Sequence, residues 1–352
     1  MSTPPVDGDA STTGIGLVGA GRIGTSHARL LATRVPGARL VAVADPRPGA
    51  AAALAGPLGA VGVESPAELL ARDDVDAVVV TASTEAHADL VEAAARAGKA
   101  VFCEKPAGLS LAELDRGIAA TEAAGVAFQV GFNRRFAPEF AAARAAVDAG
   151  RIGRPQLLRS LTRDPGLPNP AAVPAWAVFV LTLIHDFDTI LWLHPGAEPV
   201  SVYAVADALV APEFKEAGLL DTAVVTIRFD DGAIAVAEAN FSAGYGYDVR
   251  GEVFGSAGTL RIGEEPRTAL QVFDADGRHS ATPRSDVELF GDAYAGELTE
   301  FVAAVREGRR PAVTGHDARR ALSIALSCIA SVRTGGPVDP ALVAGTVDAR
   351  IR

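Results

Sequence analysis

Between residues 14 and 130, short valine-rich runs alternate with alanine-rich stretches, and this alternation restricts the possible folds more than any other feature of the chain. The runs are apolar at consecutive positions, as parallel strands buried on both faces must be. One intervening stretch, SPAELLA, begins with Ser65 as a suitable N-cap and Pro66 at the first helical position. The pattern predicts a doubly wound α/β sheet. Its strands are expected at GIGLVG (14–19), RLVAVAD (39–45), DAVVVTA (76–82), AVFCE (100–104) and AFQVGF (127–132).

The alternation of strand-like and helix-like segments ends after GRIGRP at 150–155. Strand-like segments follow, and DDG at 230–232 is a hairpin turn signal between two of them. Two later stretches, 293–308 and 317–335, return to helical spacing. We therefore predict a C-terminal α/β domain with a large, mainly antiparallel open sheet. Its strands are expected at LLRSLT (157–162), VSVYAVA (200–206), TAVVTIRF (222–229), AIAVAEANFS (233–242), VRGEVFG (249–255) and GTLRIG (258–263).

The composition argues against several classes of protein. A net charge of −11 disfavours binding to nucleic acid and to anionic membranes. Cys103 and Cys328 are too few for a disulfide framework or a thiolate metal site, so we expect no metal and a reducing, cytoplasmic location. No segment has the roughly 20 apolar residues that a bilayer-spanning helix needs. The first twelve residues lack the basic and apolar regions of a signal peptide. The expected partner is a small molecule.

A glycine motif follows the first predicted strand directly. Gly19, Gly21 and Gly24 form G-x-G-x-x-G before a helical stretch. The first glycine permits a tight turn, the second lets a pyrophosphate approach the backbone, and the third lets helix and strand pack closely. We expect Arg22 and Ile23, inside the motif, to contact the same ligand. The motif predicts a Rossmann domain at 14–133, after a disordered tail at 1–13 and before a second domain at 134–352.

The end of the second strand indicates which dinucleotide binds. Asp45 closes that strand 21 positions after Gly24, where a carboxylate would bond the adenosine ribose hydroxyls. Because the same carboxylate would repel a 2′-phosphate, NAD is favoured over NADP. Arg47 leaves the preference open, since its side chain would either contact the adenine or a phosphate or be an ordinary solvated arginine.

Polar residues follow the later strands at the edge where ligands bind in such sheets. Thr81, Ser83 and His87 come after the fourth strand and are expected near the cofactor, although His87 fits a cap or packing role better than a catalytic one. Glu104 and Lys105 come after the next strand and are also assigned to the cofactor site. Pro106 holds Lys105 extended, which would orient its ammonium group.

The segment AWAVFVLTLIHDFDTILWL, residues 175–193, places His185, Asp186 and Asp188 in an otherwise nearly unbroken apolar run. Burying a polar group without a hydrogen bond costs roughly 2–7 kcal/mol. These side chains therefore need partners or a chemical role.

The motifs together resemble the Gfo/Idh/MocA oxidoreductases. GAGRIG, DAVVVTASTEAH, GKAVFCEKP, VGFNRRF, GRIGRP and DFD occur in that family's order and spacing over residues 14–340. GFNRRFAPEF, TRDPGLPNP, IHDFD, YGYD and FGSAGTL are most similar to the inositol 2-dehydrogenase branch. The resemblance implies hydride transfer between NAD and a cyclitol, polyol or sugar carbon. It also implies that 134–352 is a substrate-binding and oligomerisation domain, with a homotetramer or homodimer formed through its open sheet.

The resemblance also assigns roles to residues. Lys105 matches the catalytic lysine, and His185 matches the histidine that exchanges the hydroxyl proton. Arg135, Asp164 and Tyr245 match polar positions that line the sugar pocket. The alternatives for these pocket positions are Asn133, Arg134, Asn169 and Tyr247.

One departure from the family pattern concerns the substrate. Leu181 stands where the pattern has an aspartate four residues before the histidine, and Trp176 and Ala177 replace a Gly-Gly pair. If this segment is α-helical, Leu181 lies one turn from His185 and contributes an apolar contact to the substrate pocket. We expect Asp188 to supply a substitute hydrogen bond, and we expect weak activity on myo-inositol compared with a deoxy, amino or glycosylated ring.

Two other functions stay open at this point. Leu181 also fits a protein that senses dinucleotide or sugar without turning it over. Redox-cycling cleavage of a glycoside with regenerated NAD would use the same fold.

Overall fold

The computed structural model describes residues 12–263, 271–275 and 277–343. The tail predicted for residues 1–13 therefore lies almost wholly outside the described residues. The chain divides into two compact units, and the chain passes between them more than once. Unit 1 contains the described residues up to Gly108, together with Glu113–Gly131 and Tyr294–Gly315. Unit 2 contains Leu109–Ala112, Phe132–Ala293 and the described residues from His316 onward.

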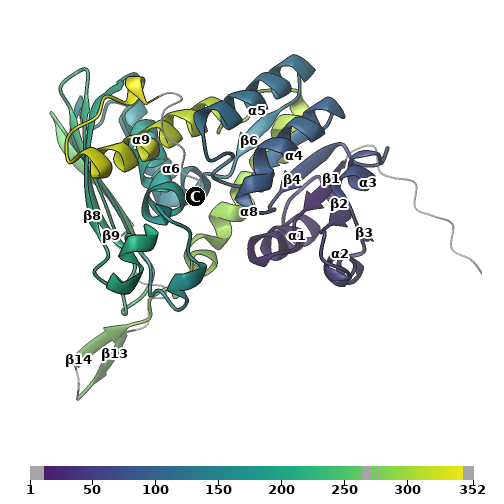
Figure 1. Cartoon of the computed structure of the whole chain (residues 1–352), viewed down its shortest axis with the longest axis horizontal. Helices are drawn as coiled ribbons and strands as arrows, with labels where there is room; N and C mark the ends of the chain where they lie inside the picture. The colour runs from purple at the N-terminus through teal and green to yellow at the C-terminus, as the bar shows by residue number, and fades with distance from the viewer. Residues whose placement is uncertain (1–11, 264–270, 276, 344–352) are drawn as a thin grey trace, which may run out of the picture. The chain divides into compact units, whose positions relative to one another are not determined.

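Unit 1 is built on a parallel six-stranded sheet of order β3-β2-β1-β4-β5-β6 (Figure 1). This is the predicted Rossmann arrangement, and each of the five predicted strands is present. The sixth, β3, has three residues and a central glycine, too short for a periodicity argument. The strands are β1 (Thr13–Val18), β2 (Ala38–Ala44), β3 (Val61–Val63), β4 (Ala77–Val80), β5 (Ala100–Cys103) and β6 (Phe128–Val130).

Helices cover both faces of this sheet. Ser65 caps α3 as predicted, since its hydroxyl accepts a hydrogen bond from the Glu68 N–H at 3.2 Å. On one face Gly16 packs so closely on Leu69 of α3 that a side chain would not fit. The helices are α1 (Arg22–Thr33), α2 (Ala50–Ala55), α3 (Pro66–Leu70), α4 (Thr84–Arg96) and α5 (Leu111–Ala124), with a 3₁₀ turn at Gly56–Leu58.

A late segment of the chain completes the core of unit 1. Helix α8 (Asp286–Glu307) contributes Leu298, Phe301 and Val302 to the apolar cluster that α1 and α2 form with the sheet. All three of these side chains are buried. The Rossmann core therefore needs residues that lie far along the chain from its strands.

Unit 2 contains a six-stranded sheet of order β12-β11-β7-β10-β9-β8. Only β7 and β10 pair in parallel, so the predicted mainly antiparallel sheet is confirmed. The strands are β7 (Pro155–Arg163), β8 (Pro199–Asp207), β9 (Thr222–Phe229), β10 (Ile234–Asn240), β11 (Asp248–Gly255) and β12 (Gly258–Ile262), and a separate hairpin joins β13 (Gln271–Asp274) to β14 (Gly277–Ser280).

The helices of unit 2 lie on one face of its sheet. Helix α7 packs on β7 and β10, and α6 contacts β12. The helices are α6 (Pro138–Asp148), α7 (Ile184–Leu193) and α9 (Gly315–Thr334); shorter helical turns are Asn133–Phe136, Pro170–Ala172, Pro212–Ala217 and Pro340–Leu342, and a π-helix spans Val178–Leu183. Among the described residues, no helix is both long and apolar enough to cross a bilayer.

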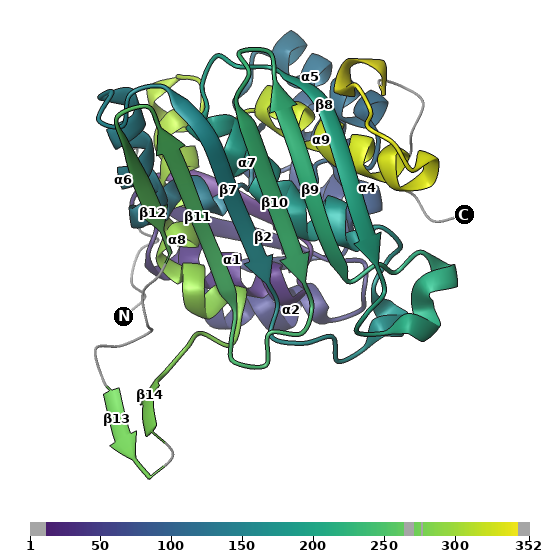
Figure 2. The same cartoon turned by 90° about the vertical axis from the view of Figure 1, so that its left-hand side faces the viewer.

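The opposite face of this sheet is open in Figure 2. Phe254, Leu157 and Ile234 lie side by side across β11, β7 and β10, and each is 44–50% exposed. Val205 and Val224 form a second exposed pair across β8 and β9. Apolar rows of this kind are usual where a partner covers a surface.

Candidate active site

The glycine motif forms a tight turn between β1 and α1. Gly19 has a φ of +105°, and a Cβ at Gly24 would lie 1.8 Å from the Gly19 carbonyl oxygen, so neither position accepts a side chain. A Cβ at Gly21 would meet nothing within 4 Å. Space is therefore open to a phosphate beside Gly21, where α1 begins with Arg22 and Ile23 in its first turn.

Asp45 lies beside this turn at the end of β2. Its carboxylate accepts hydrogen bonds from the Ala20 N–H at 2.7 Å and from the Arg47 N–H and side chain at 2.9–3.0 Å. Chiefly the Arg47 hydrogen bonds hold the pKa of Asp45 at about 2. The carboxylate is therefore ionised at neutral pH, and it lies just after the carboxyl end of β2, at the edge where ligands bind in such sheets.

Arg47 contacts Asp45 and the Ala20 carbonyl, while its side chain is 63% exposed. The sequence left this residue open between a cofactor contact and a solvated position. The structure gives it a partner that neither alternative named, and its exposure leaves room for the guanidinium to turn away when a ribose approaches Asp45.

The residues after β4 differ in accessibility. The Thr81 hydroxyl is buried and lies 2.8 Å from the Gly19 carbonyl oxygen, so it supports the glycine turn from behind. Ser83 is exposed just before α4. His87 is buried between two loops, with Nδ1 2.8 Å from the Pro106 oxygen and Nε2 3.0 Å from the Ala82 oxygen. This contact ties the Lys105–Pro106 loop to the loop after β4.

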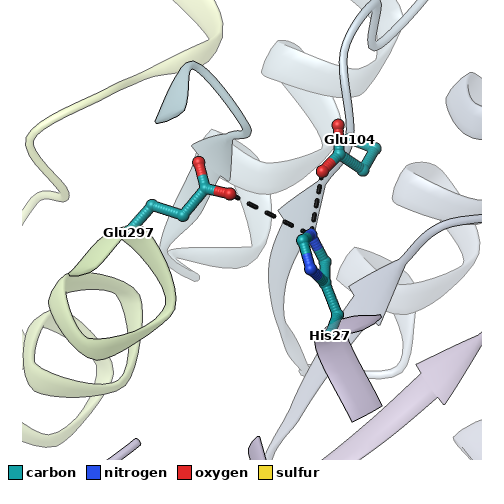
Figure 3. Close-up of side chains that lie close together, drawn as sticks. All are labelled: His27, Glu104 and Glu297. Carbon is teal, nitrogen blue, oxygen red and sulfur yellow. Dashed lines mark hydrogen bonds and ion pairs between the residues drawn. The ribbon is translucent and has the colours of Figure 1, made fainter. Parts of the chain in front are cut away.

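Glu104 and Lys105 follow β5 at the same edge of the sheet. The Glu104 side chain is buried, and its Oε2 accepts a hydrogen bond from the Lys105 N–H at 3.1 Å. Its Oε1 lies 2.8 Å from Nε2 of His27 on α1. Figure 3 shows these two side chains together with Glu297 of α8, which points into the same buried space. Lys105 itself is partly exposed.

His185 lies in the first turn of α7 in unit 2. It is partly exposed, and its ring meets the edge of Phe132 at 5.9 Å between centroids. Leu181 lies in the preceding π-helix, in which each hydrogen bond spans five residues. The segment was expected to be α-helical throughout, whereas the structure has a π-helix at Val178–Leu183 before the α-helix that carries His185.

Trp176 lies two residues before the π-helix and has an unusual backbone. Its φ is +61°, a left-handed value that is rare for a bulky residue. Its N–H donates to the Gly218 carbonyl at 2.9 Å, its carbonyl accepts from Phe179, and the Arg333 guanidinium lies 5.1 Å from its ring centre. The chain thus carries tryptophan at a position whose backbone suits the glycine of the family pattern.

Asp186 is part of a fully buried polar network. It accepts hydrogen bonds from Arg134 at 2.8 Å and from the hydroxyls of Ser160 and Thr162 at 2.5 and 2.7 Å. Arg134 is 2% exposed and Asp186 is 0% exposed. Together these contacts supply the partners that a buried charge requires.

Asp188 binds the neighbouring arginine. Arg135 donates to both of its carboxylate oxygens, at 2.9 and 2.5 Å, and also pairs with Asp317 at 3.2 Å. Burial raises the pKa of Asp188, while Arg135 opposes that rise. The sequence predicted a hydrogen bond between Asp188 and His185, whereas the partner that the structure describes for Asp188 is Arg135. Arg134 thus pairs with Asp186, and Arg135 pairs with Asp188. These two ion pairs account for the buried acids of the apolar run.

The structure separates the two tyrosines of YGYD. Tyr245 is 55% exposed, donates to Asp248 at 2.7 Å and lines a shallow depression with Arg163 and Glu238 on the open face of the sheet. Tyr247 is partly exposed, and burial together with the nearby Asp164 carboxylate raises its pKa. Tyr247, the alternative in the sequence analysis, is therefore the tyrosine beside Asp164, whereas Tyr245 lies on the face opposite α7.

Sequence reasoning missed several residues of these sites. His27 lies three residues after Gly24, but a histidine on an amphipathic helix carries no signal of its own. Glu297 lies in a late helix, and only the fold brings it to unit 1. For Asp186, the buried acid was noticed but its pairing with Arg134 was not, because that pairing spans 52 residues.

Comparison with known proteins agrees with this geometry. A family model described as an oxidoreductase family with an NAD-binding Rossmann fold matches residues 13–132, and a GFO/IDH/MocA C-terminal domain model matches residues 140–261. The chain belongs to the Gfo/Idh/MocA oxidoreductase family. As a member it carries an NAD-binding Rossmann domain, and the open space at Gly21 and the ionised Asp45 fit that cofactor.

Relatives within the family are similar over nearly their whole length. The inositol 2-dehydrogenase of Rhizobium meliloti (strain 1021) is 39% identical over 324 residues, covering 91% of this chain and 97% of the relative. The scyllo-inositol 2-dehydrogenase (NAD(+)) of Bacillus subtilis (strain 168) is 38% identical, covering 92% and 95%. The crystal structure of scyllo-inositol dehydrogenase from Lactobacillus casei with bound NAD(H) and scyllo-inositol has a TM-score of 0.89 at 29% identity, covering 94% of this chain and 99% of that one.

Proposed function

We propose that this Gfo/Idh/MocA protein is an NAD-dependent dehydrogenase that acts on a CH–OH group of a cyclitol, polyol or sugar. The observation that carries the proposal is the edge of the unit 1 sheet. There the glycine turn, Asp45 and Lys105 follow strands β1, β2 and β5 at their carboxyl ends, the edge at which ligands bind in doubly wound sheets. The relatives named above support the substrate class.

The chain's own residues take distinct roles in this proposal. Gly21 gives the pyrophosphate access to the backbone, and Asp45 binds the adenosine ribose hydroxyls. When bound, NAD accepts the hydride of the alcohol. Lys105 places a positive charge at the reacting oxygen, and the imidazole of His185 accepts the hydroxyl proton, a task common for histidine in general acid–base catalysis. The roles of Lys105 and His185 rest on the family resemblance.

The remaining site assignments concern the pocket for the substrate ring. Arg135, Asp164 and Tyr245 are proposed from the resemblance to contact the ring. Support differs among them. Arg135 is held rigidly by Asp188 and Asp317, and Asp164 lies beside Tyr247. Tyr245 has only the resemblance in its favour, because its side chain lies on the open face of the sheet.

We further propose that the preferred substrate is less polar than myo-inositol, such as a deoxy, amino or glycosylated ring. Leu181 replaces an aspartate of the family pattern and so removes a polar side chain, and Trp176 replaces a glycine and adds an aromatic one. Leu181 is partly exposed in the π-helical segment that leads into His185, so an apolar side chain is available to a ligand there.

A substrate screen tests both proposals. The purified protein is incubated with NAD and a panel of inositols, inosamines, deoxyinositols, pyranoses and glycosides, and NADH formation is followed by absorbance. Turnover of a ring alcohol supports the dehydrogenase. A kcat/KM for myo-inositol at or above roughly 10⁴ M⁻¹s⁻¹ would contradict the altered substrate.

Further measurements on the same compounds separate the two alternative functions. A sensor would bind NAD and a sugar in calorimetry without forming NADH. A glycoside-cleaving enzyme would release an aglycone without net NADH.

We also propose that the protein is a homotetramer or homodimer formed through the open sheet face, and that it works in the cytoplasm. The exposed apolar rows across β7–β12 support the assembly. The two cysteines, Cys103 and Cys328, are both free and buried, as is usual in a reducing compartment.

A further inference from the structure

Three side chains from distant parts of unit 1 meet in one buried cluster (Figure 3). They are His27 on α1, Glu104 after β5 and Glu297 on α8, and one ligand-type atom from each lies within 4.8 Å of the others. Nε2 of His27 is 2.8 Å from Glu104 and 4.0 Å from Glu297. We call these three residues the HEE cluster. The proposed reaction has so far given His27 and Glu297 no role.

The two carboxyl groups of the HEE cluster have different surroundings. Glu104 receives a hydrogen bond from the Lys105 N–H and contacts the His27 ring. Neither oxygen of Glu297 has a hydrogen-bond partner among the described residues, although its side chain is fully buried. Two neighbouring buried carboxyls cannot both be ionised at low cost. Hydrogen bonding lowers the pKa of Glu104 against the effect of burial, whereas burial and the Glu104 charge raise that of Glu297.

Glu104 is also connected to Lys105. The two residues are adjacent, and the Glu104 carboxylate fixes the Lys105 N–H. The Lys105 ammonium is close enough to lower the pKa of both Glu104 and Glu297. On the other side of Lys105, the carbonyl of Pro106 is held by His87. Buried contacts therefore fix the backbone on both sides of this lysine.

A metal ion is a competing occupant of the HEE cluster, but two observations disfavour it. Ligand atoms that share a tetrahedral zinc ion at about 2.0–2.2 Å lie roughly 3.3–3.6 Å apart. His27 and Glu104 are 2.8 Å apart, a hydrogen-bond distance. The Lys105 ammonium would in addition repel a cation at this position.

We propose that Glu104 is the positioning residue of Lys105, and that His27 and Glu297 complete a buried cluster in which Glu104 is the single ionised carboxylate. The inference rests on the proposed dehydrogenase function. Glu104 would orient the lysine backbone and keep the side chain protonated. Glu297 would act as a neutral acid that fills the cluster without adding a second charge.

Four variants test this assignment. Glu104→Gln removes the charge at nearly constant shape, Glu104→Asp keeps the charge on a shorter stem, and Glu297→Gln replaces a neutral acid by a neutral amide. The matched control is Glu300→Gln, on the same helix, where the carboxylate pairs with Arg309 at the surface. Each variant is assayed for kcat, KM and thermal stability with the alcohol on which the wild type is most active.

A second readout does not depend on activity. The chain has only three lysines, Lys99, Lys105 and Lys215. Reductive ¹³C-methylation of the full-length protein therefore gives few dimethyl-lysine NMR signals, and Lys105→Arg identifies that of Lys105. Titrating this signal reports the pKa of Lys105 directly, while activity is measured on unmethylated protein.

We expect Glu104→Gln to lower the pKa of Lys105 by about one unit or more, because it removes an adjacent negative charge. Its kcat should fall roughly tenfold or more with KM changed less than about threefold. Glu104→Asp should keep the pKa of Lys105 close to the wild-type value, because the negative charge is retained. Glu297→Gln and Glu300→Gln should leave both the pKa and kcat nearly unchanged.

Several outcomes would overturn the proposal. Equal losses of kcat in Glu104→Gln and Glu297→Gln with no change in the Lys105 pKa would make the cluster purely structural. One equivalent of metal in the purified protein, lost in Glu297→Gln, would make it a metal site. A wild type that oxidises none of the alcohols would contradict the proposed function, and the NMR titration would still decide the role of Glu104.

Discussion

At the scale of single residues, the buried acids of α7 show how a charge is made tolerable in an apolar core. Asp186 is surrounded by the Arg134 guanidinium and two hydroxyls of β7, so every polar contact it loses leaves another buried group unsatisfied. We expect Asp186→Ala to lower the free energy of unfolding by about 3–5 kcal/mol, measured by urea denaturation. The control Asp148→Ala removes an exposed pair with Arg144 and should cost less than about 1 kcal/mol. Equal costs would show that burial does not govern these pairs.

Asp45 determines the expected choice of dinucleotide. Its ionised carboxylate would bond a ribose diol and repel a 2′-phosphate. Asp45→Ala should therefore weaken binding of NAD more than that of NADP in fluorescence titrations. Asp74→Ala, which removes an exposed carboxylate paired with Arg72, is the control and should change neither affinity. Equal losses for both dinucleotides would assign the discrimination to Arg47.

Lys105 is expected to act in the chemical step. Lys105→Ala should lower kcat by roughly 100-fold or more, as removal of a positioned acid, base or charge commonly does. Binding of NAD, measured by fluorescence, should largely survive because the glycine turn and Asp45 are unchanged. Lys215→Ala is the control, since that lysine pairs with Asp207 in unit 2. Full turnover by Lys105→Ala would refute the role taken from the family.

At the scale of elements, the π-helical segment is the place where the chain departs from regular geometry. Trp176 has a φ of +61°, whereas the next residue, Ala177, has an α-helical φ of −51°. Left-handed backbone costs a residue with a Cβ about 1 kcal/mol or more relative to glycine. Trp176→Gly should therefore be more stable than Trp176→Ala by about 1 kcal/mol in thermal unfolding.

The neighbouring position supplies the control for this comparison. At residue 177 glycine should be less stable than the native alanine by roughly 0.5–1 kcal/mol. If alanine were also the more stable residue at position 176, the left-handed backbone would carry no cost there.

Regular elements were predictable because their signals are local. The buried strands of unit 1 are apolar on both faces, and β9 alternates strictly between buried and exposed residues, as its sequence TAVVTIRF suggests. The π-helix was not predictable. Its residues are typical of an ordinary apolar helix, and no sequence pattern indicated the left-handed backbone of Trp176 two residues before it.

The site was predictable only where function restricts a short motif. The glycine turn and Asp45 lie where the spacing predicted them. At Gly19 and Gly24 a side chain would clash, so the fold requires glycine at these two positions. The partners of Glu104 and Asp188 were beyond reach, since His27 and Arg135 are 77 and 53 residues away along the chain. Such pairs form only when tertiary packing brings distant residues together, and a single sequence does not show which residues will meet.

At the scale of the whole molecule, the open sheet face predicts assembly. Light scattering at micromolar concentration should give a mass that is a multiple of 36.0 kDa. Leu157→Glu places a charge in the exposed row between Phe254 and Ile234 and should shift the protein to smaller species. Val61→Glu, at an exposed position of β3 in unit 1, is the control and should leave the mass unchanged. A monomeric wild type would exclude the proposed interface.

The late contribution of α8 to the core of unit 1 has a consequence for biosynthesis. A nascent chain that has emerged only as far as β6 already carries all strands of the Rossmann sheet, but Leu298, Phe301 and Val302 have not yet been translated. Until they emerge, the cluster beneath α1 and β5 stays exposed to water. We expect a ribosome-bound chain arrested near residue 150 to be sensitive to protease and to bind chaperones, and one arrested well beyond residue 315 to be resistant.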